Sequence, residues 1–455
     1  MILRKDTVKI KMSFRQLLRG GFMKKIKKAV ALWLCIALCV ALLAGCTGLS
    51  AANRQTAEAY IQDYFQQNFS KMVSDYTYSQ EAKAAITQDV LKGSYEVIVG
   101  HLGVPDSLEK QKDSLPNRAT YLAVFRSGSL LAHVVFNEKD EIIGFFIEPY
   151  DTLTMPETIV EKEIKFGEQD YPLTGTLTSP RDAQSNTVVI LVAGSGPSDR
   201  NESLGVLKPF RDIAWGLSQR NISVFRYDKR TYTHKTKLAQ AENFTVDDEI
   251  IDDVTYAYYK MHALGYDNIY ILGHSFSGHL MGRITKELPW AEGYIIMAGN
   301  VTPIEDLALA QVKYLSEFDG KVSQEEMAEI QKWEVQNTNI KNLTKENAAS
   351  YTTEELMGAP ASYWLDLKGY DPLSVAKSRG KLLVLQGAND YQVSVHEYAL
   401  WQNGLAGHKN VTFKLYDKLN HLFMPSKVMN ASDYQTMNYV DNVVLDDIAA
   451  FTGNQ

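Results

Sequence analysis

The sequence predicts an α/β domain with a largely parallel sheet, preceded by a smaller α+β domain. From about residue 155 onward, short apolar runs typical of buried strands alternate with helical patterns. That order is typical of a parallel sheet with crossover helices. Before residue 150, helical patterns come first and strand patterns then follow one another, which favours a small antiparallel α+β fold.

The first domain is predicted to span residues 56–150. Its opening helix is indicated by an apolar stripe at helical spacing, made of Ala57, Tyr60, Ile61, Tyr64 and Phe65. We expect further helix over residues 80–102 and strands over 119–126, 129–136 and 141–147. This domain carries no catalytic constellation, and its aromatic residues are interpreted as core.

The second domain is predicted to span residues 155–455. A leading hairpin is followed by alternating strands and helices, with strands over 159–166, 171–178, 188–192, 222–227, 268–272, 293–298, 383–390 and 411–416. Between residues 302 and 377 the strand pattern stops, and helical segments with capping boxes at Ser323/Glu326 and Thr352/Glu355 replace it. We interpret this segment as a helical lid that excludes water from a site.

A candidate nucleophile lies directly after an apolar strand. Gly273-His274-Ser275-Phe276-Ser277-Gly278 follows the run 268–272 and leads at once into a helical pattern. A strand that ends in Gly-x-Ser and turns sharply into a helix holds the serine hydroxyl where a base can reach it. The sequence therefore predicts Ser275 as a nucleophile.

An acid and a base follow at the ends of later strands. Asp390 ends the run 383–390, and His421 follows the strand-like residues 411–416. A serine hydroxyl needs a neutral imidazole to take its proton, and the imidazole needs a carboxylate to fix its tautomer. The chain order Ser275, Asp390, His421 is that of the α/β-hydrolases. Each residue alone could be a turn or loop residue, but together they predict a catalytic triad.

A glycine-rich loop supplies candidate oxyanion donors. The apolar run 188–192 opens into Ala193-Gly194-Ser195-Gly196-Pro197. Acyl transfer builds negative charge on the former carbonyl oxygen, which preorganised backbone N–H groups must meet. We expect the N–H groups of Phe276 and Ser195 to be these donors. The alternative is an ordinary strand-to-helix turn.

These motifs resemble a bacterial branch of the α/β-hydrolase superfamily, similar to dienelactone-hydrolase-like and prolyl-oligopeptidase-like serine esterases. The resemblance covers about residue 157 to the C-terminus and implies an eight-stranded hydrolase fold that cleaves carboxylic esters. It departs from the family at Ser277 and Thr231, where glycine is usual. The first domain looks like NTF2-like or cystatin-like modules that precede such hydrolases.

Other polar clusters are interpreted as structural. Asp228 and Arg230 suit ion-pair or turn roles. The acidic run 247–249 lies at the start of a predicted helix, which favours helix electrostatics over a metal site. We therefore expect neither a metal nor a cofactor.

The N-terminus resembles a bacterial lipoprotein signal. Basic residues precede an apolar run over 29–44, which ends in Leu43-Ala44-Gly45-Cys46. This resemblance implies cleavage before Cys46, a lipid on its side chain and a short tether over residues 47–55. The alternative is an uncleaved anchor. Translation from Met23 would give a signal of ordinary length.

Composition agrees with an extracytoplasmic globular protein. All three cysteines lie within the segment that ends at Cys46, so the mature chain would form no disulfide. The net charge is −7 and no basic stripe is present, which argues against nucleic-acid binding.

We therefore predict a membrane-anchored serine hydrolase whose partner is a small acyl or ester substrate. A serine peptidase or an acyltransferase could use the same triad. A surface-binding lipoprotein that keeps the scaffold without catalysis is a further alternative.

Overall fold

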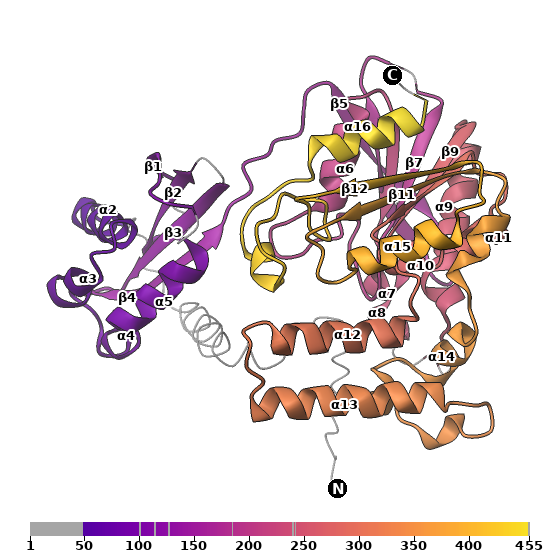
Figure 1. The fold of residues 1–455 in the computed structure, drawn as a ribbon. Coiled ribbons are helices and arrows are strands. Elements are labelled where there is room, and N and C mark those ends of the chain that lie inside the picture. The colour runs from indigo at the N-terminus through magenta and orange to yellow at the C-terminus, as the bar shows by residue number, and fades with distance from the viewer. Residues whose placement is uncertain are drawn as a thin grey trace, which may run out of the picture.

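An eight-stranded sheet organises the second half of the chain (Figure 1). The computed structural model describes residues 49–99, 102–112, 115–125, 128–183, 185–238, 241 and 243–453. The sheet has the order β12-β11-β10-β9-β7-β8-β6-β5. Its strands are β5 (Ile159–Phe166), β6 (Leu173–Pro180), β7 (Thr187–Val192), β8 (Ser223–Tyr227), β9 (Asn268–His274), β10 (Gly293–Met297), β11 (Lys381–Gly387) and β12 (Val411–Tyr416).

The strands from β8 to β12 in the sheet run parallel, whereas β5 and β6 form an antiparallel hairpin at one edge. This is the α/β-hydrolase fold that the motifs predict. Register places Val192 opposite Gly273, and Met297 opposite both His274 and Leu385. The carboxyl ends of four neighbouring strands therefore lie at one level, where open α/β sheets place their sites.

Helices cover both faces of this sheet. One core lies under α6 (Pro209–Ser218) and α16 (Asn442–Phe451), and a second lies under α9 (Asp252–Ala263), α11 (Met281–Glu287) and α15 (Val395–Gly404). The strands between them are apolar on both faces, as in β7, where every residue is buried. The helix predicted to start at the acidic run 247–249 begins with the π-helical turn η2 (Asp247–Ile251).

The predicted lid is helical throughout its described length and follows β10, the sixth strand of this sheet. Its elements are α12 (Ile304–Glu317), α13 (Gln324–Lys341), η3 (Ala348–Ser350), η4 (Glu354–Leu356), α14 (Ala361–Leu367) and η5 (Pro372–Lys377). The Ser323/Glu326 box caps α13 as predicted, and Thr352 and Glu355 exchange the same pair of hydrogen bonds. In Figure 1, α12 and α13 lie side by side below the sheet.

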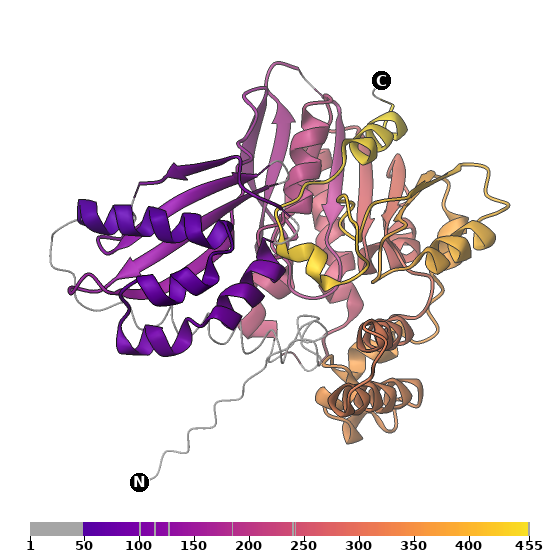
Figure 2. The ribbon, with the colours of Figure 1, turned by 60° about the vertical axis from the view of Figure 1, so that its left-hand side comes forward.

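A separate four-stranded antiparallel sheet lies in the first part of the chain (Figure 2). Its strands are β1 (Ser107–Lys110), β2 (Arg118–Phe125), β3 (Gly128–Phe136) and β4 (Ile142–Pro149), and its helices are α2 (Ala51–Phe65), α3 (Phe69–Asp75), α4 (Gln80–Ala85) and α5 (Gln88–Ile98). The aromatic residues of α2 pack against this sheet and form with it a hydrophobic core separate from those of the eight-stranded sheet. The sequence did not predict β1.

Two sequence predictions for this region are wrong. Helix α2 begins at Ala51, inside the predicted 47–55 tether, because Ser50 caps it and Asn53 donates a 2.6 Å hydrogen bond to Asp140. The predicted 80–102 helix is two helices. It breaks at Ile86, whose side chain is buried, and Thr87 caps α5 by accepting a hydrogen bond from the Val90 N–H.

Within the described residues, no helix is long and apolar enough to span a membrane.

We predict that Phe225→Ala destabilises the hydrolase domain by about 3–5 kcal/mol, because it leaves a cavity in a close-packed core. Phe225 is fully buried on β8 and packs edge-on against Phe166. The midpoint of thermal unfolding should fall on the order of 10 °C. Phe318→Ala is the matched control, since Phe318 is 48% exposed. Equal midpoints for the two variants would contradict this placement of the core.

Candidate active site

The candidate nucleophile has a strained backbone. Ser275 directly follows β9 and precedes α10 (Phe276–His279), with φ 54° and ψ −117°. A non-glycine residue in this region costs on the order of 1–3 kcal/mol and persists only where its surroundings enforce it. Here the Ser275 N–H donates to the Met297 carbonyl at 2.9 Å. A Cβ placed on Gly194 would lie 3.1 Å from the Ser275 Cβ, so glycine lets the two backbones approach.

Ser277 is the first departure from the family pattern. It links the elbow, the sharp turn over residues 273–278 that carries Ser275, to the end of the neighbouring strand β7. Its side chain is fully buried, and its Oγ donates a 2.6 Å hydrogen bond to the Ala193 carbonyl. The position remains tightly packed, since a Cβ on Gly273 would lie 2.6 Å from the Ser277 carbonyl oxygen. The serine thus satisfies a buried carbonyl at the start of the glycine-rich loop.

Asp390 and His421 meet in a buried contact. His421 Nδ1 lies 2.7 Å from Asp390 Oδ2. The carboxylate is fully buried, and it also accepts hydrogen bonds from the N–H groups of Gln392 and Val393 and from the Gln386 side chain. These donors replace the hydrogen bonds to water that burial removes, so the carboxylate oxygens are satisfied within the protein.

This contact defines the state of the imidazole. A carboxylate can only accept, so His421 Nδ1 carries the proton and Nε2 keeps its lone pair. Among the described residues, Nε2 has no hydrogen-bond partner, and no hydrogen bond joins it to Ser275. The ring of His274, the residue before Ser275, lies with its centre 4.7 Å from that of His421.

A tight turn positions His421 after β12. The Asn420 side-chain oxygen accepts hydrogen bonds from the N–H groups of Leu422 and Met424, and its amide donates to Asp433 at 2.7 Å. Phe423 has φ 58° and is fully buried. The segment Asn420-His421-Leu422-Phe423 is therefore a side-chain-stabilised turn that presents the imidazole at the edge of the sheet.

The two candidate oxyanion amides are both without a hydrogen bond in the described structure. In the glycine-rich loop, the Gly194 N–H donates to Glu202 at 2.7 Å and the Gly196 N–H donates to Glu249 at 2.9 Å. The Ser195 N–H lies between these two and has no partner among the described residues, and the same holds for the Phe276 N–H at the start of α10. Unpaired N–H groups at such a position can donate hydrogen bonds to an anion.

A buried ion pair holds one side of this loop. Lys229 Nζ lies 2.7 Å from both Glu249 Oε1 and the Gly194 carbonyl oxygen. The lid residue Tyr363 donates to the other oxygen of Glu249 at 2.7 Å. Thr231, the second departure from the family pattern, places its hydroxyl 3.4 Å from the Gly196 carbonyl. The loop is thus held by β8, η2 and the lid together.

Sequence reasoning missed this role for Lys229 and Glu249. The sequence predicts that Glu249, like its acidic neighbours, only stabilises the start of a helix. In the structure its side chain is buried. The one signal in the sequence is a lysine directly after a buried strand. The structural interpretation of the neighbouring residues is confirmed, since Asp228 pairs with Arg200 at 2.6 Å and Arg230 pairs with Asp253 at 2.8 Å.

The large aromatic residues of the lid mostly pack in its core. Trp333 packs with Ala308 and Val312 in a small cluster between α12 and α13. Trp364 is buried and donates to the Leu356 carbonyl. Tyr363 lies nearest the elbow, with its ring centre 6.4 Å from that of Phe276.

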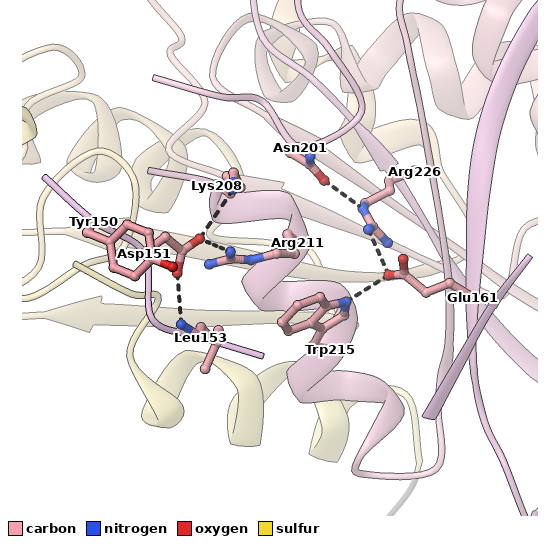
Figure 3. Close-up of a pocket in the computed structure, with 9 residues that line it drawn as sticks. All are labelled: Tyr150, Asp151, Leu153, Glu161, Asn201, Lys208, Arg211, Trp215 and Arg226. Atoms are coloured by element: carbon pink, nitrogen blue, oxygen red, sulfur yellow. Dashed lines mark hydrogen bonds and ion pairs between the residues drawn. The ribbon is translucent and has the colours of Figure 1, made fainter. Parts of the chain in front are cut away.

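A cavity of about 490 Å³ lies elsewhere, where the linker between the two sheets meets α6 (Figure 3). Asp151 of the linker pairs there with Lys208 and Arg211, and Arg226 pairs with Glu161 at 2.8 Å. Ser275, Asp390 and His421 do not line this cavity. Its charges are paired within the chain, so we interpret it as a junction between linker and hydrolase.

Within the described ranges, no group of three or more His, Cys, Asp or Glu residues is arranged to hold a metal ion.

Comparison with known proteins gives the family. The chain is 31% identical over 335 residues to Esterase EstD of Thermotoga maritima, an alignment that covers 71% of this chain and 77% of the relative. The chain belongs to the α/β-hydrolase esterases. It is accordingly a serine hydrolase on an α/β scaffold. No protein-family model matches the sequence.

Solved structures with similarity to this esterase-family chain include two esterases and a peptidase. An esterase of Pyrococcus furiosus has 13% identity and a TM-score of 0.38, over 58% of this chain and 84% of that one. The esterase domain of a Rhodothermus marinus protein has 15% identity and a TM-score of 0.39, over 64% and 97%. The Pyrococcus horikoshii acylaminoacyl peptidase has 13% identity and a TM-score of 0.43, over 76% and 48%.

We predict that Lys229→Met lowers the free energy of unfolding by about 3–5 kcal/mol, because it leaves the buried Glu249 carboxylate without its counter-charge. Esterase activity should fall as well, since the Gly194 carbonyl loses its donor. Lys235→Met is the matched control because Lys235 is exposed. Denaturant midpoints and ester hydrolysis rates check both effects. A Lys229 variant as stable as the control would show that the pair contributes little.

Proposed function

We propose that this protein hydrolyses carboxylic esters through an acyl-enzyme, with Ser275 as nucleophile, His421 as base and Asp390 as the carboxylate that orients it. The buried 2.7 Å contact between Asp390 and His421 carries the proposal, because it leaves the Nε2 lone pair available beside the elbow. The strained Ser275 backbone supports it, since such strain gathers at active sites. The relative named as an esterase makes esters the first substrates to test.

In the first step His421 Nε2 takes the proton of Ser275 Oγ as that oxygen bonds to the carbonyl carbon. The carbonyl oxygen becomes an oxyanion, which the Ser195 and Phe276 N–H groups stabilise. The bond to the alcohol oxygen then breaks, and His421 gives its proton to the leaving alcohol. In the second step a water molecule loses a proton to His421 and attacks the acyl carbon, which releases the acid and restores Ser275.

We predict that Ser275→Ala abolishes ester hydrolysis and labelling by a fluorophosphonate, without loss of folding. Asp390→Asn should lower kcat on the order of 10³–10⁴-fold, because the imidazole then adopts the wrong tautomer. Both are measured with a panel of p-nitrophenyl esters of increasing chain length, with circular dichroism as the folding check. Labelling that persists in Ser275→Ala would reject this nucleophile.

The same panel separates the alternative reactions. Short chromogenic peptides assayed beside the esters identify a peptidase, and an added alcohol acceptor that changes the product identifies an acyltransferase. An inactive, unlabelled wild-type chain would favour the non-catalytic alternative.

We also propose that the chain is exported and anchored to the bacterial membrane through a lipid on Cys46. This residue lies outside the described part of the chain, so the proposal rests on the Leu43-Ala44-Gly45-Cys46 motif and the basic and apolar run before it. Two acyl chains or one chain with a second signal are needed for stable attachment, which a lipidated N-terminal cysteine would supply.

We predict that Cys46→Ser abolishes lipid attachment to the full-length protein expressed in bacteria, because serine lacks the sulfur that would carry the lipid. Incorporation of labelled palmitate should be lost with it. Cys39→Ser is the matched control, since Cys39 lies in the same segment but outside the motif. Equal palmitate incorporation in the two variants would reject Cys46 as the lipidated residue.

A further inference from the structure

Glu202 joins the glycine-rich loop to the elbow. It lies in the segment between β7 and α6, with its side chain 12% exposed. Its Oε1 accepts the Gly194 N–H at 2.7 Å, and its Oε2 lies 2.8 Å from His274 Nδ1. His274 is the residue before Ser275 and is itself buried. Glu202 thus contacts both segments that would surround a bound carbonyl.

The other nitrogen of His274 binds the backbone of the proposed base. His274 Nε2 lies 2.9 Å from the His421 carbonyl oxygen. A carbonyl oxygen can only accept, so Nε2 carries a proton. A neutral ring would then carry only a lone pair at Nδ1, 2.8 Å from Glu202 Oε2, and no positive charge to offset the buried carboxylate.

A second proton on His274 supplies that positive charge. The Nδ1–Oε2 contact does not have the angle of a hydrogen bond, and neither atom has another partner among the described residues, so the attraction between them is ionic. An unpaired buried charge costs several kcal/mol, whereas an opposite charge at this distance compensates it. The geometry therefore favours an imidazolium against a carboxylate.

The surrounding charges support this assignment. Burial alone would lower the pKa of His274, but the facing Glu202 carboxylate outweighs it and raises that pKa above its usual range, and Asp390 adds to the effect. Burial alone would raise the pKa of Glu202, but His274 and the Gly194 N–H hold it below its usual range. The His274 ring also faces the ring of His421, whose centre lies 4.7 Å away, and the uncharged ring of Phe210 from α6.

Backbone strain at Glu202 is a further observation in favour of a specific role. Glu202 has φ 50°, a conformation that a residue with a long side chain rarely adopts. Neighbouring residues hold it there, because Asp199 accepts the N–H groups of Asn201 and Ser203, and Arg226 donates to the Asn201 side chain. The loop is built to aim this carboxylate inward.

We propose that Glu202 and protonated His274 are positioning residues. They hold the glycine-rich loop, the elbow and the turn that carries His421 in fixed positions relative to one another. The proposal rests on the function assigned above to Ser275 and His421. Glu202 binds the Gly194 amide, His274 binds the His421 carbonyl, and the ion pair between Glu202 and His274 links the two. Loss of that link lets the oxyanion donors and the base drift relative to Ser275, which affects turnover more than substrate binding.

The proton on His274 makes this arrangement dependent on pH. Because the pKa of His274 is raised in the folded protein, the attraction is complete below the unperturbed value of about 6.5. It is lost as the pH rises through the higher folded-state pKa.

The first test reads the proton directly. In protein labelled with ¹⁵N-histidine, the ring signals of His274, assigned by their absence in His274→Gln, should show both nitrogens protonated at pH 6.5. Their titration midpoint should lie above about 6.5. In Glu202→Gln it should fall below about 6.5, because burial lowers the pKa and is then opposed only by the lesser effects of Asp390 and the His421 carbonyl. A wild-type midpoint below this value, or one that Glu202→Gln leaves unchanged, would overturn the proposal.

The second test reads turnover. Glu202→Gln keeps an acceptor for the Gly194 N–H but removes the charge, so we expect kcat on ester substrates to fall about 10- to 100-fold with KM changed less than about threefold. Glu287→Gln, on the exposed end of α11, is the matched control and should leave both constants unchanged. A kcat for Glu202→Gln within twofold of the wild-type value would reject the positioning role.

The two proposals fail in different ways. If Ser275 is not the nucleophile, Ser275→Ala retains fluorophosphonate labelling while the His274 titration still depends on Glu202. If the ion pair is wrong, the titration does not depend on Glu202 while Ser275→Ala still loses labelling. The wild-type midpoint is read without Glu202→Gln, so a value below about 6.5 overturns the proposal even if that variant proves unstable.

Discussion

The constraint on which the site depends is the left-handed backbone of Ser275. A serine at φ 54° is unfavourable by itself, so the structure around it must outweigh the strain. The hydrogen bond from its N–H to Met297 and the close approach of Gly194 do so from the two neighbouring strands. Both strands are fully buried, and their helices cover them on both faces. The rigid parallel sheet is therefore what makes a strained, partly exposed serine possible at this position.

Buried charge, more than loop packing, organises the segments around that serine. The glycine-rich loop has little side-chain surface, so apolar burial cannot fix it. Instead Lys229 and Glu249 hold it from one side and Glu202 with His274 from the other. The Gly194 and Gly196 amides donate to carboxylates, and the Ser195 amide between them has no partner in the part of the chain that the structure describes. The same carboxylates that fix the loop also leave its central donor available.

Both departures from the family pattern contribute to the same region. Ser277 and Thr231 replace glycines, and each brings a hydroxyl to a carbonyl of the segment between Ala193 and Gly196. A hydroxyl at these positions satisfies backbone acceptors that burial would otherwise leave unpaired. The changes are therefore compatible with the fold of an α/β-hydrolase esterase.

The sequence alone determined the order of the strands in the hydrolase domain, the turn at Ser275, the helical segment after β10 and the family, because these depend on local periodicity and on short motifs. It also predicted Asp390 and His421, since each closes a recognisable strand. Tertiary structure decided which side chains contact the loops around Ser275 and His421. Glu202 and Glu249 lie 8 and 53 residues from the amides that they bind, and no local pattern encodes such contacts. It likewise decided the start of α2, where Asn53 donates to Asp140 of the turn between β3 and β4. It also decided the break at Ile86, because that side chain is buried in the core of the first domain.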